Sequence, residues 1–110
     1  MAKFAIFFSY TPDAWQAMLD GPSDRAAAAQ QVIESVGGTL ESYYWMFGEH
    51  DGFVVAEVGD SLSAAAISVA VSSSKALTNV STHELLDGDA RDALVAKART
   101  AVGSYTPPTG

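Results

Sequence analysis

Residues Thr39 to Val58 read TLESYYWMFGEHDGFVVAEV, two apolar and aromatic runs joined by the polar residues Gly48 to Asp51. Runs rich in Tyr, Trp, Phe and Val on either side of a short connection containing Gly and Asp are typical of a β-hairpin. A four-residue connection would place five pairs side by side: Trp45 with Val54, Tyr43 with Ala56, Met46 with Phe53, Tyr44 with Val55, and Ser42 with Glu57. Both faces of the hairpin would then carry large apolar side chains.

The residues before the hairpin predict one strand and two helices. Phe4 to Tyr10 is apolar on both alternating faces, which is typical of a strand covered on both sides. Thr11-Pro12-Asp13 supplies an N-cap and a proline for the first helical position, so a helix should begin there. Asp20-Gly21-Pro22 interrupts this helix, and a second one should follow the cap at Ser23-Asp24 and end at Gly37-Gly38.

A helix, a strand and a last helix are predicted after the hairpin. Asp60 can cap a helix from Ser61 to Ser73 that is apolar nearly all round, and such a helix is buried on more than one side. Leu77 to Leu86 alternates as a half-exposed strand does. Asp87-Gly88-Asp89 then turns into a helix over about residues 90–100. Its inward residues would be Leu94, Val95 and Ala98.

The order of these elements, β-α-β-β-α-β plus a terminal helix, predicts the α+β ferredoxin-like fold, an antiparallel four-stranded sheet with helices on one face. We expect one domain over residues 1–103 and a proline-rich tail over residues 104–110. The helices can cover one face of the sheet, yet the first three strands are apolar on both faces. Because such an exposed face marks an interface, the sequence predicts a homodimer with the two sheets face to face, or a higher even-numbered oligomer.

Composition excludes several classes of partner. The chain of 110 residues is 48% hydrophobic, and its formal net charge is −7 with six scattered Lys and Arg. Nucleic acid and anionic membranes need a basic surface, so neither is expected as a partner. The absence of cysteine excludes disulfides, thiolate catalysis and Cys-ligated metals. Residues 1–10 are interpreted as a strand and not a signal peptide, since no small-residue cleavage site follows, and a cytoplasmic location is expected.

Several short motifs resemble those of the GYD domain family, small bacterial proteins of the dimeric α/β-barrel type. The matching residues are Tyr10-Thr11, Arg25, Gly37-Gly38, Tyr43-Tyr44, Phe47 to Asp51, the helix after Asp60, and Tyr105 with Pro107-Pro108. His50 stands where the family usually has its tyrosine, which blocks transfer of any role of that hydroxyl. The resemblance implies a fold and a dimer more than a reaction. Relatives with this barrel include cofactor-independent monooxygenases, lactone isomerases and small-molecule binders, by analogy of fold only.

Three titratable residues are candidate acids or bases. His50 lies between Glu49 and Asp51, and Asp51 could hold the tautomer of a histidine base; alternatively Gly48 and Asp51 only form the turn while His50 faces solvent. His83 is the second histidine, on the last predicted strand. No metal site is expected, because His50 and His83 lack a local ligand spacing.

Glu57 is the third candidate, because it lies within an apolar strand. A carboxylate on a buried sheet face must be paired, hydrogen-bonded or raised in pKa. It could act in a pocket lined by Tyr10, Tyr44, Met46 and Phe53, or it could reach solvent where the strand ends. A pocket for an apolar or aromatic ligand could also be lined by the aromatic residues Tyr10, Tyr43, Tyr44, Trp45 and Phe47. Alternatively, these residues fill the core and the interface.

Three classes of function therefore stay open. The first is a homodimeric binding module that encloses a small apolar or aromatic metabolite between sheet and helices. The second is a cofactor-independent isomerase or monooxygenase-like enzyme that uses His50, Glu57 or His83 as acid or base. The third is a structural protein with a filled core. None of the three requires a cofactor.

Overall fold

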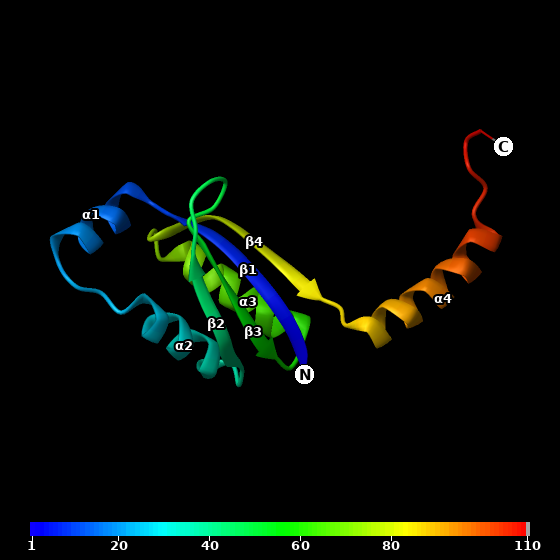
Figure 1. The fold of residues 1–110 in the computed structure, drawn as a ribbon, viewed down its shortest axis with the longest axis horizontal. Helices are drawn as coiled ribbons and strands as arrows, with labels where there is room; N and C mark the ends of the chain where they lie inside the picture. Colours follow the sequence, from blue (N-terminus) through cyan, green and yellow to red (C-terminus); the bar gives the residue numbers. More distant parts are fainter. Residues whose placement is uncertain (110) are drawn as a thin grey trace.

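The computed structural model describes residues 1–109 and shows a four-stranded antiparallel sheet with helices (Figure 1). The strands are β1 (Ala2–Tyr10), β2 (Thr39–Trp45), β3 (Gly52–Val58) and β4 (Leu77–Leu85). The helices are α1 (Pro12–Asp20), α2 (Arg25–Ser35), α3 (Ser61–Ser73) and α4 (Gly88–Ser104). The strands lie in the order β2-β3-β1-β4, and every neighbouring pair is antiparallel. The α+β, ferredoxin-like arrangement predicted from the element order is confirmed.

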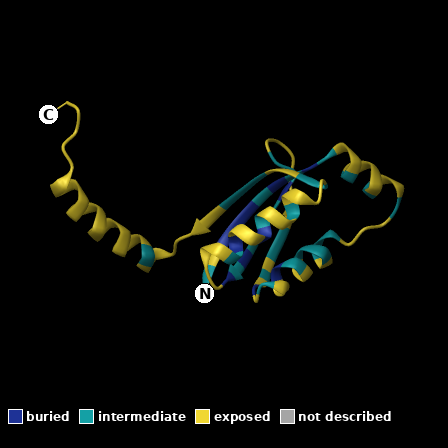
Figure 2. Ribbon diagram, turned by 180° about the vertical axis from the view of Figure 1, so that it is seen from behind, coloured by how far each residue is buried: buried dark blue, intermediate teal, exposed yellow. Residues whose placement is uncertain are grey.

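The core lies between one face of the sheet and helices α2 and α3 (Figure 2). Alternate residues of the two central strands meet apolar residues of these helices. The buried set consists of Phe4, Ile6, Phe8 and Tyr10 of β1, Val54, Ala56 and Val58 of β3, Ile33 of α2, and Ala64 and Ile67 of α3. Each large side chain in this layer stabilises the fold by about 1.5–3 kcal/mol.

Each helix begins at the capping residue that its sequence suggests. The side-chain oxygen of the cap accepts a hydrogen bond from a backbone N–H in the first turn: Thr11 from Ala14 (3.2 Å), Asp24 from Ala27 (3.0 Å), Asp60 from Ser63 (2.7 Å) and Asp87 from Ala90 (2.8 Å). Such a bond satisfies one of the backbone donors left free at a helix start. The predicted break between α1 and α2 and the start of α3 at Ser61 are confirmed.

The predicted pairing of the hairpin is wrong by two residues. The structure pairs Tyr43 with Val54 and Tyr44 with Phe53. The connection is longer than four residues, because Asp51 is bound to the end of β1: its N–H donates to the Phe8 carbonyl (2.9 Å), and its carboxylate accepts from the Tyr10 N–H (2.9 Å).

The register of the hairpin is shifted by two residues from the prediction. Because side chains alternate between the two faces with a period of two, each residue near the turn still lies on the face predicted for it. Farther along, β2 has an irregularity between Leu40 and Ser42. As a result Glu57 lies opposite Thr39 and not opposite Ser42. The other neighbour of Glu57 is Lys3 on β1.

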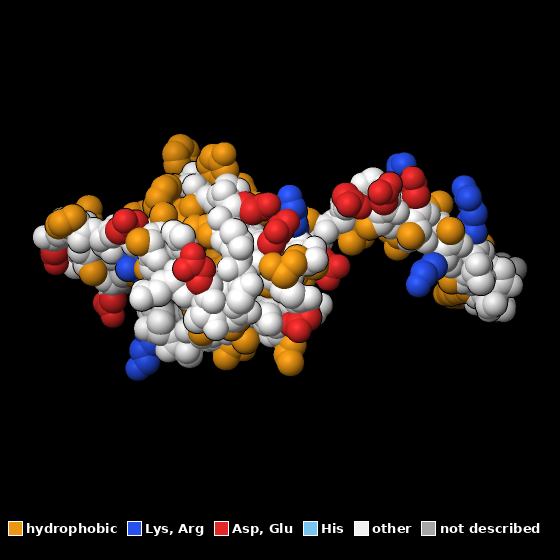
Figure 3. Space-filling view, turned by 90° about the horizontal axis from the view of Figure 1, so that it is seen from below, with side chains coloured by type: hydrophobic (Ala, Val, Ile, Leu, Met, Phe, Trp, Pro, Cys, Tyr) orange, Lys and Arg blue, Asp and Glu red, His pale blue; other side chains and the backbone are white. Residues whose placement is uncertain are grey.

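Helix α4 is longer than predicted and leads away from the sheet as an arm (Figures 1 and 2). The prediction that Leu94, Val95 and Ala98 turn inward is wrong: Leu94 is 52% exposed, Val95 is 37% exposed, and α4 contains no buried residue. An apolar stripe indicates which face of a helix is suited to burial, but it does not specify which surface covers that face. Figure 3 shows acidic side chains along one edge of the first part of the arm and apolar side chains along the opposite edge.

Candidate functional site

A partly enclosed cavity of about 210 Å³ lies inside the helix-covered side of the sheet. The apolar wall comes from three elements: Ile6, Phe8 and Val54 of the sheet, Ala29 and Ile33 of α2, and Ile67 and Val71 of α3. Ala28 and Ala29 of α2 contribute only methyl groups to this part of the wall. The sequence thus leaves a space in this layer that larger residues would fill.

Two tyrosines form a polar end of this cavity. The hydroxyl oxygens of Tyr10 and Tyr43 lie 2.6 Å apart, and the indole N–H of Trp45 donates to the Tyr10 hydroxyl at 3.3 Å. Burial raises the pKa of the Tyr43 phenol above its usual range, and the hydrogen bond with Tyr10 raises it further. Tyr43 is therefore neutral at physiological pH and can donate a hydrogen bond.

Arg25 is the cation of the cavity wall. It occupies the first position of α2, directly after the cap Asp24. Its Nε atom is buried and has no hydrogen-bond partner within residues 1–109. The positive charge of Arg25 lowers the Tyr43 pKa and so opposes the larger effect of burial, which places the guanidinium near the two phenols.

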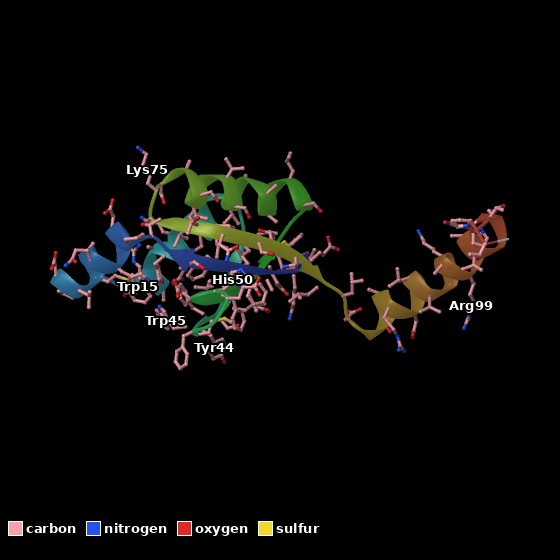
Figure 4. All side chains as sticks on the ribbon, turned by 90° about the horizontal axis from the view of Figure 1, so that it is seen from above. Trp15, Tyr44, Trp45, His50, Lys75 and Arg99 are labelled. Atoms are coloured by element: carbon pink, nitrogen blue, oxygen red, sulfur yellow. The ribbon has the colours of Figure 1, made fainter. Side chains whose placement is uncertain are left out.

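The opposite side of the sheet, which we call the open face, carries a row of rings. Phe53 stacks between Phe7 and Tyr44, with centroids 5.2 and 5.5 Å apart. The rings of His50 and His83 both contact Phe7, at 5.4 and 5.7 Å. Figure 4 shows His50 over the middle of the sheet and Tyr44 at its edge. Large apolar surface on this face is not covered by α2 or α3: Tyr44, for example, is 59% exposed.

The predicted Glu49-His50-Asp51 group does not converge on one point. The Asp51 carboxylate binds the backbone N–H of Tyr10, and the Glu49 carbonyl accepts from the Asn79 amide at 3.1 Å. Both therefore attach the hairpin turn to β1 and β4, whereas the turn interpretation placed His50 in solvent. The His50 side chain packs on Phe7, and its Nε2 atom is buried without a partner among the described residues.

The other predicted site residues divide between the two faces of the sheet. Tyr10 lines the cavity, whereas Tyr44 and Phe53 lie on the open face. His83 is on the open face too, where its Nε2 atom is 2.6 Å from the Ser81 hydroxyl. Glu57 of β3 lies between Thr39 of β2 and Lys3 of β1. Met46 lies in the hairpin connection and is 38% exposed. The structure thus brings one predicted ligand-binding residue, Tyr10, to the cavity.

Sequence reasoning did not assign Arg25 to a site, and noted it only as a residue that resembles the GYD family. Tyr43 was among the aromatic residues that could line a pocket, and the structure places it on the cavity wall. The available signal was the lone cation at the head of a run of four alanines, Ala26 to Ala29, where no large side chain can fill the layer. Tyr43 shares its sheet face with Trp45 in the predicted hairpin, and this alternation is retained in the structure.

Residues 1–109 contain neither a cluster of metal ligands nor a helix that could cross a membrane. Within this range no three His, Asp or Glu side chains gather in a way that could hold a metal ion. No helix in the same range is long and apolar enough to cross a membrane.

Comparison with known proteins agrees with the motifs in the sequence. The family model of the GYD domain matches residues 4–95, which include β2, β3, β4, all of β1 except its first two residues, the cavity and the row of rings. No curated protein matches the chain in sequence. Since the matched segment covers most of the 110 residues, the chain belongs to the GYD domain family.

Proposed function

We propose that this protein is a binding module that holds a small apolar or aromatic metabolite in the cavity between its sheet and helices. The observation that carries the proposal is the cavity itself, about 210 Å³ with an apolar wall and a few polar groups at one end. Ligand sites in proteins commonly combine an apolar lining with a few polar groups that fix orientation. The acid and base candidates His50 and His83 contact Phe7 on the open face, so the proposal includes no turnover.

The assembly we propose is a homodimer in which two open faces pack against each other. Its support is the row of rings on Phe7, Phe53 and Tyr44, which is apolar, extends across three strands and is not covered by α2 or α3. Face-to-face sheets pack about 10 Å apart with interdigitated side chains. In such a dimer each chain keeps its own cavity on the outer side.

Filling the cavity tests the proposed ligand site. Ala29 lines the cavity, so Ala29→Leu places three additional carbons in it. Titration with toluene, followed by backbone amide shifts in NMR spectra, should show saturable binding to the wild-type protein. The amides that shift should belong to β1, α2 and α3. Ala29→Leu should weaken toluene binding at least about tenfold, because the added side chain occupies the space of the ligand.

Ala27→Leu is the matched control. Ala27 lies two residues earlier on the same helix and is exposed, so this change should leave toluene binding as it is. If toluene causes no saturable shifts in the wild-type protein, or if Ala29→Leu and the wild-type protein bind it equally well, the cavity is not a ligand site.

A further inference from the structure

The cavity wall carries a positive charge that forms no ion pair among the described residues. Arg25 contributes a buried Nε atom without a partner, and no Asp or Glu of residues 1–109 lines the cavity wall. The ion pairs formed within the same residues are Lys3 with Glu41 and Arg91 with Asp92, so neither involves Arg25. A buried donor on a charged group is costly when it has no acceptor. The missing partner is therefore an acceptor, and an anion suits it best.

A second donor is free at the same end of the cavity. The phenols of Tyr10 and Tyr43 have two hydroxyl hydrogens between them, and one lies in the bond that joins the two oxygens. The indole N–H of Trp45 donates to the Tyr10 hydroxyl oxygen, so this bond occupies a lone pair of that oxygen and uses neither hydroxyl hydrogen. One phenolic O–H thus has no acceptor among the described residues.

Ser74, another polar side chain on the cavity wall, is already satisfied. Its hydroxyl donates to the Val71 carbonyl (2.6 Å) and accepts from the Ala76 N–H (3.2 Å). The free donors of the cavity are therefore the Arg25 guanidinium and one phenol.

The size and wall of the cavity limit what such an anion can be. A cavity of about 150 Å³ accommodates benzene, so a cavity of about 210 Å³ accommodates a ring and one small polar group. The Nε–H and a neighbouring Nη–H of a guanidinium match the two oxygens of a carboxylate side by side. One guanidinium balances one negative charge, which favours a carboxylate over a phosphate dianion.

We propose that the ligand is a small carboxylic acid with an apolar body the size of a ring, whose carboxylate is bound by Arg25 and by the free hydroxyl of the Tyr10 and Tyr43 pair. The inference rests on the proposed function and specifies the chemical class of its ligand.

Three probes of nearly equal shape test the charge requirement: benzoate, benzamide and benzamidine, which are anionic, neutral and cationic at pH 7. Each is titrated into the full chain, and binding is followed by backbone amide shifts. Benzoate should bind at least about tenfold more tightly than benzamide, which is the order expected for a charge-assisted hydrogen bond. Benzamidine should bind most weakly, because its cation faces Arg25.

Variants then assign the preference to residues. Arg25→Met should reduce benzoate affinity to that of benzamide and leave benzamide affinity unchanged. Tyr10→Phe combined with Tyr43→Phe removes both hydroxyls and keeps both rings, and this double variant should weaken benzoate more than benzamide. Arg99→Met is the matched control: Arg99 lies on α4, far from the cavity (Figure 4), so this change should alter neither affinity.

The outcomes separate this inference from the proposed function. If benzoate and benzamide bind equally well to the wild-type protein, or if toluene binds and none of the three probes does, the carboxylate inference is wrong and the apolar ligand site stands. If toluene fails as well, both are wrong. Should Arg25→Met not fold, Arg25→Lys keeps the charge and loses the planar pair of donors. A benzoate preference of wild-type size both in Arg25→Lys and in the double variant Tyr10→Phe, Tyr43→Phe would then overturn the assignment.

Discussion

Tyr43 shows how one half-buried residue sets the chemistry of the cavity. Its ring lies 4.5 Å from that of Trp45, and its hydroxyl bonds to that of Tyr10 at 2.6 Å. Ionising this phenol would place a negative charge in a poorly solvated position, and burial therefore raises its pKa. The phenol remains a neutral hydrogen-bond donor over the whole physiological range of pH.

The raised pKa predicts a loss of stability at alkaline pH that depends on Tyr43. Above about pH 10 an unfolded tyrosine releases its proton, whereas folded Tyr43 retains it. The folded state then binds more protons, so the free energy of unfolding falls as pH rises from about 10 toward the higher folded pKa. The slope contributed by this residue stays below about 1.4 kcal/mol per pH unit, because the folded and unfolded states differ by at most one proton at a single phenol.

Urea unfolding at a series of pH values above neutrality measures this slope. Tyr43→Phe should make the slope shallower, since phenylalanine has no proton to release. Tyr105→Phe changes an exposed tyrosine after α4 and should leave the slope as in the wild-type protein. Equal slopes for all three proteins would contradict the effect of burial on Tyr43.

At the scale of single residues the sequence was informative where chemistry is local. The helix caps Thr11 and Asp60 were correctly predicted, because each accepts a hydrogen bond from a backbone N–H three residues along the chain. Asp51 was interpreted as a turn former, yet its carboxylate bonds to the Tyr10 N–H on another strand. The importance of Arg25 could not be predicted in this way. It depends on the absence of an acidic neighbour in three dimensions, and no pattern along the chain records that absence.

The hairpin is the element whose details depend most on tertiary contacts. Its strands and faces follow from alternation, but its register follows from the attachment of Asp51 to β1. Gly52, the first residue of β3, lies so close to its neighbours that an added Cβ would approach the Phe8 ring and the Tyr44 carbonyl oxygen to 2.9 Å. Propensity rules cannot anticipate this close approach, which involves two other strands.

Gly52→Ala should therefore destabilise the protein by about 1–3 kcal/mol, because Phe8 or the β2 backbone must shift to admit the methyl group. Gly59→Ala is the matched control: an added Cβ there meets no atom within 4 Å, and the change should alter stability by less than about 1 kcal/mol. Urea unfolding of the three proteins measures both values. If Gly52→Ala is as stable as Gly59→Ala, the close approach does not hold in solution.

Helix α4 shows a second limit of prediction at this scale. Its existence and its cap at Asp87 follow from the sequence. Its position does not, because Leu94 and Val95 only show that the helix has an apolar side. The chain leaves β4 at Leu85 in a direction that carries the arm away from the core (Figure 1).

At the scale of the whole molecule, the sheet has two apolar faces and helices for only one of them. The helix-covered face contains the core and the cavity. On the open face, Phe7, Phe53 and Tyr44 form a continuous row, and exposed apolar patches of this kind are uncommon on monomers. Alternation along β1 and β3 was sufficient to predict both faces, but the sequence cannot identify what covers the second one.

The proposed homodimer predicts that one charge at the centre of this row prevents association. Phe53 lies between Phe7 and Tyr44, so Phe53→Lys would place an ammonium group in the middle of the interface. Removing that charge from water without a partner should raise the dimer dissociation constant at least about a hundredfold. Sedimentation equilibrium over a range of protein concentrations measures the constant for both proteins, and circular dichroism shows that the variant is folded.

Leu62→Lys controls for the effect of adding a charge. Leu62 is 80% exposed on α3, on the helix-covered side of the molecule, so this variant should associate as the wild-type protein does. A wild-type chain that stays monomeric at all concentrations would contradict the homodimer. If Phe53→Lys associates as strongly as Leu62→Lys, the dimer forms through another surface, and the row of rings must be stable in contact with water.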